Sequence, residues 1–218
     1  MRKENRTYYF SVEGETEQWY LEWLQMIINA EETAKYTVKL DTKVQKDPLA
    51  RVKRMTIIGK TEITHVTDFE SNEEIHVKQF HMAMDRMKDA ENLGKNVKYH
   101  FGYSNFTFEL WIILHIEECN TPMMHRRQYL LPLNRAYGEN FENLDQYKHE
   151  KNFKRILKKL TLENVLQAID RSKKIMQKNE ELGYRLQQYR GYKYYNENPS
   201  LAIWEQIERI LDECGIVR

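Results

Sequence analysis

Two short acidic runs each follow a stretch that has the composition of a β-strand. Glu13 and Glu17 follow the aromatic and β-branched run TYYFSV, and Asp68 and Glu70 follow the run EITHVT. In an open sheet of parallel strands, ligands bind outside the carboxyl ends of the strands. If the two strands lie near each other, these acids meet at one edge of the sheet.

Carboxylates that lie close together raise one another's pKa unless a cation lies between them. Mg²⁺ prefers oxygen ligands and binds through one or two carboxylates together with phosphate. Neither of the two acidic runs, EGETE and DFE, contains His or Cys, which argues against zinc. The sequence therefore predicts that Glu13, Asp68 and Glu70 bind Mg²⁺, with Mn²⁺ as a possible substitute. The alternative at this point is a pair of solvated acidic turns.

Positive charge is concentrated in the last third of a chain whose net charge is only +1. Between positions 148 and 193 there are thirteen Lys or Arg residues and five acids, which gives a net charge of +8 and leaves 1 − 8 = −7 for the remainder of the chain. Such cations can bind phosphates, or they can simply solvate exposed helix faces, which is the simpler interpretation. The candidates for nucleic-acid contacts are Lys148, Lys151, Arg185, Arg190 and Lys193.

Five tyrosines lie among the cations near the end of this basic region, at positions 184, 189, 192, 194 and 195. Aromatic rings between cations can stack on unpaired bases while the cations bind phosphates. The same rings can pack the last helices together, and this structural interpretation is slightly favoured.

The first half of the chain alternates strand-like and helix-like segments. Strands are expected at 7–12, 36–40, 62–67 and 96–103, and helices after 15, after 48, at 72–93 and at 104–116. This alternation predicts βαβ units and a mainly parallel sheet flanked by helices. Ser104 and Asn105 are expected to form the N-cap of the last of these helices.

Strand signals stop beyond Glu117, and the remaining pattern is helical. Helices are expected near 145–160, at 162–178 and at 200–214, while 122–133 receives no assignment. We therefore expect an α/β domain over residues 1–118 and a mainly helical extension over 119–218 that packs on it.

The composition, with 41% hydrophobic and 31% charged residues, is typical of a helix-rich globular protein. Cys119 and Cys214 lack the spacing of a zinc or redox site and are expected to be reduced thiols. The start lacks a signal-peptide pattern, and the longest apolar run, 110–116, is too short to span a bilayer. A cytoplasmic protein is expected. No phosphate-binding glycine loop of the GxGxxG or GxxxxGK kind appears, which disfavours a nucleotide sensor.

Several strings together resemble a known family. EGETE after the first strand and DFE after a later one resemble the Toprim domain of topoisomerases, primases and OLD-type nucleases. SNFTFELWIILH at 104–115, YKHEK at 147–151 and the triplet Asn198-Pro199-Ser200 narrow the resemblance to RloB-like proteins, which are linked to restriction and related to abortive-infection proteins. The resemblance covers residues 8 to about 211.

This resemblance implies a Toprim/Rossmann-like fold and a Mg²⁺-dependent nuclease that acts on DNA or RNA, tRNA included, in bacterial anti-phage defence. It implies that Glu13 is the general base or the acid that organises the metal, that Glu17 supports it, and that Asp68 binds Mg²⁺. Glu70 stands where Toprim proteins usually have a second Asp. The alternative is a catalytically degenerate Toprim module that binds nucleic acid or a companion defence protein. The oligomeric state stays open.

Glu109 and His115 are further candidate site residues within the string at 104–115. They are six residues apart, so on a helix they lie on almost opposite faces. Glu109 closely follows the fourth strand and can reach the acidic edge, or it can pair with a basic residue. The apolar members of the string, among them Phe108 and Trp111, are expected to be core.

Overall fold

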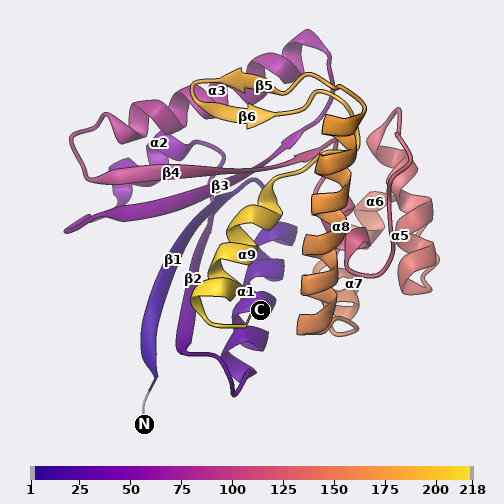
Figure 1. Cartoon of the computed structure of the whole chain (residues 1–218), viewed down its shortest axis with the longest axis horizontal. Coiled ribbons are helices and arrows are strands. Elements are labelled where there is room, and N and C mark those ends of the chain that lie inside the picture. Colours follow the sequence, from indigo (N-terminus) through magenta and orange to yellow (C-terminus); the bar gives the residue numbers. More distant parts are fainter. Residues whose placement is uncertain (1–2, 217–218) are drawn as a thin grey trace.

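The computed structural model describes residues 3–216 and contains one parallel four-stranded sheet (Figure 1). Its strands are β1 (Glu4–Val12), β2 (Tyr36–Val44), β3 (Thr61–Phe69) and β4 (Val97–Asn105). The helices that connect them are α1 (Glu15–Ala30), α2 (Pro48–Arg54) and α3 (Glu74–Glu91). The predicted α/β fold with a parallel sheet flanked by helices is confirmed.

The strand order β2-β1-β3-β4 places β1 beside β3, with Val12 opposite Val66. The chain passes from β1 to β2 on one side and then crosses to β3 on the other. The C-terminal ends of β1 and β3 therefore flank the point where the strand order reverses, which is where open α/β sheets bind ligands.

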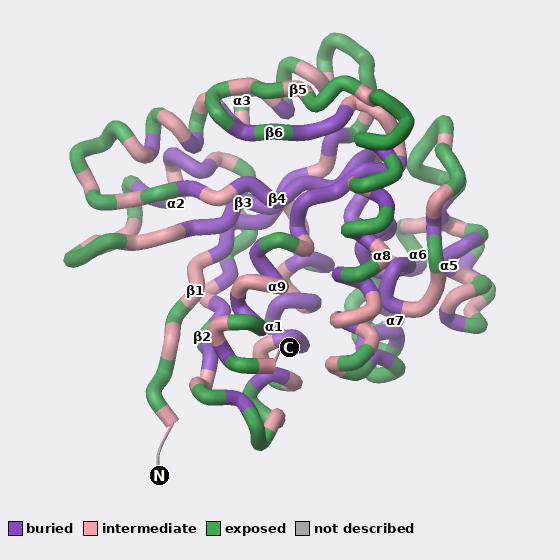
Figure 2. The backbone as a smooth tube through the Cα atoms, in the orientation of Figure 1, coloured by how far each residue is buried: buried purple, intermediate pink, exposed green. Residues whose placement is uncertain are grey.

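Each face of the sheet has its own hydrophobic cluster, because successive strand residues point to opposite faces. Phe10, Val12 and Val66 pack in the cluster that contains α1. Ile63 and Phe69 pack in the other cluster, against α3 and the short helix α2. Figure 2 shows buried residues along β3 and the second half of β4, whereas the start of β1 and the outer side of α3 are exposed.

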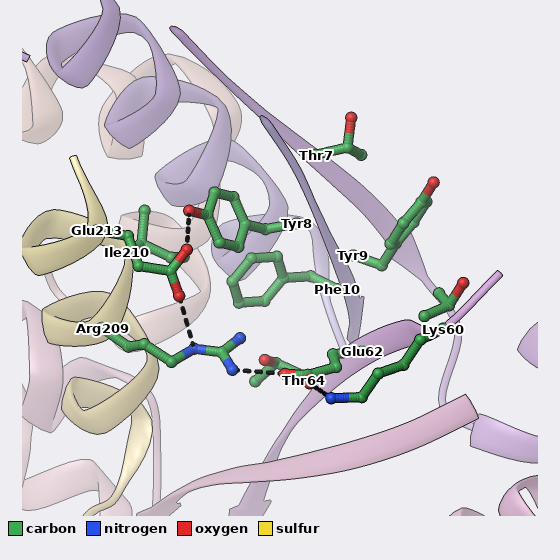
Figure 3. Close-up of a pocket in the computed structure, with 11 residues that line it drawn as sticks. Thr7, Tyr8, Tyr9, Phe10, Lys60, Glu62, Thr64, Arg209, Ile210 and Glu213 are labelled. Carbon is green, nitrogen blue, oxygen red and sulfur yellow. Dashed lines mark hydrogen bonds and ion pairs between the residues drawn. The ribbon is translucent and has the colours of Figure 1, made fainter. Parts of the chain in front are cut away.

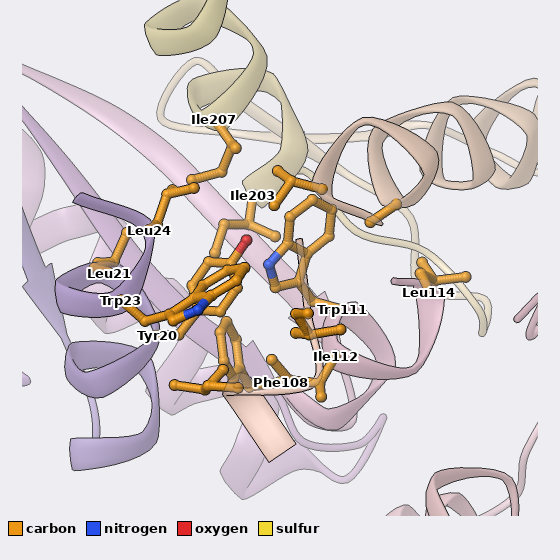
Figure 4. Packing of buried hydrophobic residues seen from close by; sticks show 14 of the residues in the cluster. Tyr20, Leu21, Trp23, Leu24, Phe108, Trp111, Ile112, Leu114, Ile203 and Ile207 are labelled. Carbon is orange, nitrogen blue, oxygen red and sulfur yellow. The ribbon is translucent and has the colours of Figure 1, made fainter. Parts of the chain in front are cut away.

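The second half of the chain is mostly helical. Its elements are α4 (Glu109–Leu114), the 3₁₀ helix η1 (Arg126–Tyr129), α5 (Leu130–Tyr137), α6 (Leu144–Lys148), α7 (Glu150–Leu157), α8 (Leu162–Glu181) and α9 (Ile203–Glu213). The fully buried Trp111 of α4 lies among Tyr20 of α1 and Ile203 of α9 (Figure 4). One hydrophobic cluster thus joins helices from both halves of the chain.

The prediction that strands stop beyond Glu117 is wrong, because β5 (Gln187–Tyr189) and β6 (Tyr192–Tyr194) form an antiparallel hairpin. Tyr192 and Tyr194 are buried against the α3 side of the sheet, where Tyr194 contacts Phe80 edge-on. Tyr189, Tyr192 and Tyr194 therefore have a packing role, but against α3 and β4 and not between the last helices.

The predicted N-cap at Ser104 and Asn105 is also wrong. Both residues belong to β4, and α4 begins only after Phe108. The side-chain amide of Asn105 donates hydrogen bonds to the carbonyl oxygens of Tyr195 and Glu197, and so ties the end of β4 to the C-terminal segment.

Two other expectations concern the cysteines and the membrane. Cys119 and Cys214 are buried free thiols. Among the helices in residues 3–216, none combines the length and the apolar character needed to cross a bilayer.

Candidate active site

Glu13 directly follows β1 and is held against the end of β3. Thr67 Oγ1 donates a hydrogen bond of 2.6 Å to Glu13 Oε1, and the backbone N–H of Asp68 donates to the same carboxylate. Burial outweighs these hydrogen bonds and raises the pKa of Glu13. The two acidic runs therefore meet in space, as their positions after neighbouring parallel strands require.

Asp68 lies on the α1 side of the sheet, two residues after Val66. Burial, followed by the negative charges of Glu17, Glu13 and Glu109, raises its pKa well above the usual range. Like charges disfavour the ionised form at short range. Three other acidic side chains therefore lie close enough to the Asp68 carboxyl to act on its pKa.

Glu17 is buried in the first turn of α1, where Thr16 Oγ1 donates a 2.9 Å hydrogen bond to its Oε2. Burial raises its pKa, although its own backbone N–H and Thr16 act in the opposite direction. A β-carbon on Gly14 would lie 3.0 Å from Glu17 Oε2. Gly14 has extended backbone angles, so the glycine is needed here for space and not for a left-handed conformation.

Glu109 opens α4 and its side chain is fully buried. Thr107 Oγ1 donates a hydrogen bond to Oε2, and Lys148 Nζ lies 3.2 Å from Oε1. Burial alone would lower the pKa of Lys148, but the carboxylates of Glu109 and Asp68 outweigh it and raise that pKa. Lys148 therefore supplies one positive charge to a cluster of four carboxylates.

A sharp turn between β4 and α4 brings Glu109 to the cluster. Phe106 has a φ of 65°, a left-handed conformation that is uncommon for an aromatic residue. Its backbone N–H donates a 2.8 Å hydrogen bond to the carbonyl of Phe69 at the end of β3. The strained turn is thereby fixed to the strand that carries Asp68, and strain of this kind concentrates at functional sites.

Glu70 lies at the rim of the site. Its side chain is 44% exposed and its Oε2 lies 3.4 Å from Nε2 of His76. It lines the same pocket of about 300 Å³ as Glu13, Glu17 and Asp68. Arg126 and Lys148 are the cations among the residues that line it, which are Glu13, Gly14, Glu15, Thr16, Glu17, Asp68, Glu70, Arg126 and Lys148.

A comparison with protein-family models matches residues 8–210 to the model described as RloB-like protein. The match covers nearly the whole chain. The chain belongs to the RloB-like protein family. No curated protein and no solved structure matches this RloB-like chain significantly.

The donor set of the RloB-like site suits a hard divalent cation, because it consists of carboxylate oxygens without His or Cys. Glu109 Oε1 also lacks a hydrogen-bond partner within residues 3–216, apart from the ion pair with Lys148. In the same part of the chain, no three acidic, His or Cys side chains already form a compact ligand cage. Glu13, Glu17, Asp68 and Glu70 line one pocket, but their carboxylates do not surround a common point as the ligands of an ion do.

His115 lies away from this pocket. Its Nδ1–H donates a 2.8 Å hydrogen bond to the carbonyl of Trp111, and Tyr20 Oη donates to its Nε2 at 3.1 Å. Burial lowers its pKa to about 4. The histidine is a neutral core residue, and its distance from Glu109 along the helix explains why only Glu109 reaches the site.

Of the five predicted nucleic-acid contacts, only Lys148 lines the pocket with the carboxylates. Lys151, Arg185 and Lys193 are exposed on α7 and around the hairpin, and Arg190 Nε is paired at 2.5 Å with Asp85 of α3. Sequence reasoning missed Arg126, which lies in the segment 122–133 that received no assignment. It also missed the threonines that hold the acids: Thr16 and Thr107 lie one and two residues before their partners, whereas Thr67 bonds to Glu13 from the neighbouring strand.

A second pocket, also of about 300 Å³, lies toward the amino ends of β1 and β3 (Figure 3). Here Arg209 Nη1 lies 2.6 Å from Glu62 Oε2, Lys60 Nζ lies 2.8 Å from Glu62 Oε1, and Tyr8 Oη donates a 2.6 Å hydrogen bond to Glu213. Lys60 and then Arg209 lower the pKa of Glu62. Its acids are compensated by their neighbours, in contrast to the raised pKa values at the carboxylate cluster.

Proposed function

We propose that this RloB-like protein is a metal-dependent nuclease that hydrolyses phosphodiester bonds in DNA or RNA. One observation carries the proposal: Asp68, Glu17, Glu13 and Glu109 lie together at the strand ends, with Lys148 as the ion-pair partner of Glu109. A carboxyl cluster with raised pKa values in a pocket is a hallmark of functional sites. The same cluster would be costly as a purely structural feature.

In this proposal Asp68 and Glu17 hold the divalent ion, Mg²⁺ or Mn²⁺, and Glu70 contributes from the rim. A bound divalent ion would polarise the phosphodiester and lower the pKa of a water molecule, in a one-ion or two-ion arrangement. The residues of the chain have to supply the remaining steps.

Glu13 is suited to accept a proton from the attacking water. Its carboxylate is fixed by Thr67 and by the amide of Asp68, and its raised pKa brings it closer to neutral pH, where a general base works best. Lys148 keeps Glu109 compensated and leaves part of its ammonium group accessible to a phosphate oxygen, since its side chain is 37% exposed.

Cleavage by the purified protein tests the proposal directly. Single- and double-stranded DNA and RNA are incubated with Mg²⁺ or Mn²⁺, and with EDTA as the metal-free condition. Asp68→Asn and Glu17→Gln should each reduce the cleavage rate by at least about 100-fold, in line with the loss of a charged group from a catalytic site. The matched controls are Asp89→Asn and Glu22→Gln, which change exposed acids on α3 and α1.

Two outcomes would contradict the proposal. Cleavage that persists in EDTA or in both site variants would remove the carboxylates from the reaction. Nucleic-acid binding without cleavage under any metal condition would favour the degenerate binding module.

From the resemblance to restriction-linked proteins we further propose a role in anti-phage defence, alongside a companion protein. A plaque assay tests that role in a bacterial host that expresses either the parent protein or Asp68→Asn. The parent should reduce the number of phage plaques and Asp68→Asn should not; equal plaque numbers would contradict the role.

A further inference from the structure

The carboxylate pocket continues into a second hollow on the side of α5 and α6. This hollow has a volume of about 470 Å³ and shares Arg126 and Lys148 with the carboxylate pocket. Its lining residues are Arg126, Arg127, Leu130, Glu142, Asn143, Leu144, Asp145 and Lys148. We call it the Arg126–Lys148 cleft.

Arg126 and Arg127 are the free cations of this cleft. Both are exposed on η1, and neither forms an ion pair within the part of the chain that the structure describes. Arg135, Arg155 and Arg190, by contrast, each lie within 4 Å of a carboxylate. Arg54, Arg171 and Arg185 also lack an ion pair among the described residues, but none of them lines either of the two hollows. Two adjacent uncompensated guanidinium groups beside an acidic site suit an anionic ligand.

The acids of the cleft are few and lie on another element. Glu142 and Asp145 are exposed near the start of α6, whereas the arginines lie on η1. A polyanion in the cleft would therefore be attracted to the η1 wall and repelled from the α6 wall.

A hollow on the opposite side of the carboxylates offers less to an anion. It shares Glu13 and Glu70 with the carboxylate pocket, and its cations are Lys46 and Arg86. Arg86 Nε already lies 4.0 Å from Asp47, and the acids there outnumber the cations. The two hollows that flank the carboxylates therefore differ in the balance of their charges: cations outnumber acids in the Arg126–Lys148 cleft, and acids outnumber cations in the other hollow.

We propose that Arg126 and Arg127 bind the phosphodiester backbone of a nucleic-acid strand next to the carboxylate cluster. The proposal rests on the proposed nuclease function, because it names the wall that guides that substrate. Guanidinium groups match phosphate oxygens in a two-pronged geometry, which suits a position that must align the backbone. Arg126 lines both hollows, so it would hold the phosphate closest to the reacting one.

Binding is measured by fluorescence anisotropy with a labelled oligonucleotide, on an Asp68→Asn background in Mg²⁺ so that cleavage does not interfere. Single-stranded RNA, single-stranded DNA and a duplex form separate arms, which identify the preferred strand type. Arg126→Ala/Arg127→Ala is compared with Lys53→Ala/Arg54→Ala, which removes the same charge from two adjacent exposed positions on α2 outside both hollows.

The expected result is a loss of affinity of about tenfold or more for the Arg126/Arg127 pair at low salt. On a single strand, the slope of log affinity against log salt should fall by about 1.4, which is about 0.7 for each lost phosphate contact. The control pair should stay within about twofold of the parent, because its side chains are outside the cleft. Circular dichroism confirms that both double variants fold.

Equal losses of affinity in the two double variants would overturn the proposal, since the change in net charge would explain them. An unchanged affinity of Arg126→Ala/Arg127→Ala would overturn it as well. The two hypotheses fail in different ways. If the parent cleaves nucleic acid but the Arg126/Arg127 pair cleaves and binds equally well, only the assignment of the cleft is wrong. If binding depends on the two arginines but no cleavage occurs, the cleft is retained and the nuclease proposal is wrong.

Discussion

The ion pair between Lys148 and Glu109 gives the sharpest test of the electrostatics of the site. Replacing Lys148 with Met keeps most of the side-chain volume but removes the only positive charge within 4 Å of a fully buried carboxylate in residues 3–216. At a separation of 3.2 Å, two unit charges attract by about 5 kcal/mol with an effective dielectric constant of about 20.

Solvent reduces this value, because 37% of the Lys148 side chain is exposed. We therefore expect Lys148→Met to lower the free energy of unfolding by about 3 kcal/mol, at the lower end of the range for breaking a buried ion pair. Most of that loss should be recovered when Glu109→Gln is added, because the second change removes the uncompensated charge. Glu109→Gln alone gives the fourth corner of a double-mutant cycle.

Urea unfolding followed by tryptophan fluorescence measures these differences at neutral pH, without metal and with Mg²⁺. If the cluster binds Mg²⁺, the ion should stabilise Lys148→Met more than the parent, since the ion and the lysine compensate the same carboxylates. A loss below about 1 kcal/mol in Lys148→Met, or a purely additive double variant, would refute the reasoning.

Two further predictions concern a glycine and a histidine. Gly14→Ala should leave the urea midpoint almost unchanged, because the backbone is extended there, but should slow cleavage by about tenfold or more, because the new β-carbon displaces the Glu17 carboxylate. For His115, the folded state binds a proton only near pH 4 whereas the unfolded state does so near 6.5, so its stabilising contribution is complete above pH 6.5 and is lost as the pH falls. Between pH 7 and pH 5 that loss is about 2 kcal/mol, and His115→Gln should show a correspondingly smaller pH dependence of the urea midpoint.

The position of the acids after two strands was predictable because it depends on local pattern and on one general rule. Glu13 directly follows β1, Asp68 is the next-to-last residue of β3, and carboxyl ends of parallel strands share one edge. The sequence could not reveal which of the nearby acids lie deepest. Glu109 is fully buried and acts on Asp68, whereas Glu70 is at the rim, and this difference depends on the left-handed turn at Phe106.

The hairpin of β5 and β6 was missed because each strand has only three residues. A signal was nevertheless present in the two-residue loop Arg190-Gly191 between Tyr189 and Tyr192. Both loop residues have positive φ angles, 52° and 88°, as the tight turns of two-residue hairpins require. Asn105 was misassigned for a different reason, since its partners lie about 90 residues further along the chain and no local pattern reports them.

The two charged pockets explain why counting acidic and basic residues does not identify the site. At Glu62, neighbouring cations lower the pKa of the carboxyl group, so the arrangement favours folding wherever that group is ionised. At Asp68, burial and neighbouring carboxylates raise the pKa, so ionisation at neutral pH opposes folding. A fold that keeps the second arrangement carries a destabilising cluster that a bound cation would relieve. Because ionised Asp68 opposes folding, Asp68→Asn should raise the free energy of unfolding of the metal-free protein. The same variant should no longer cleave nucleic acid.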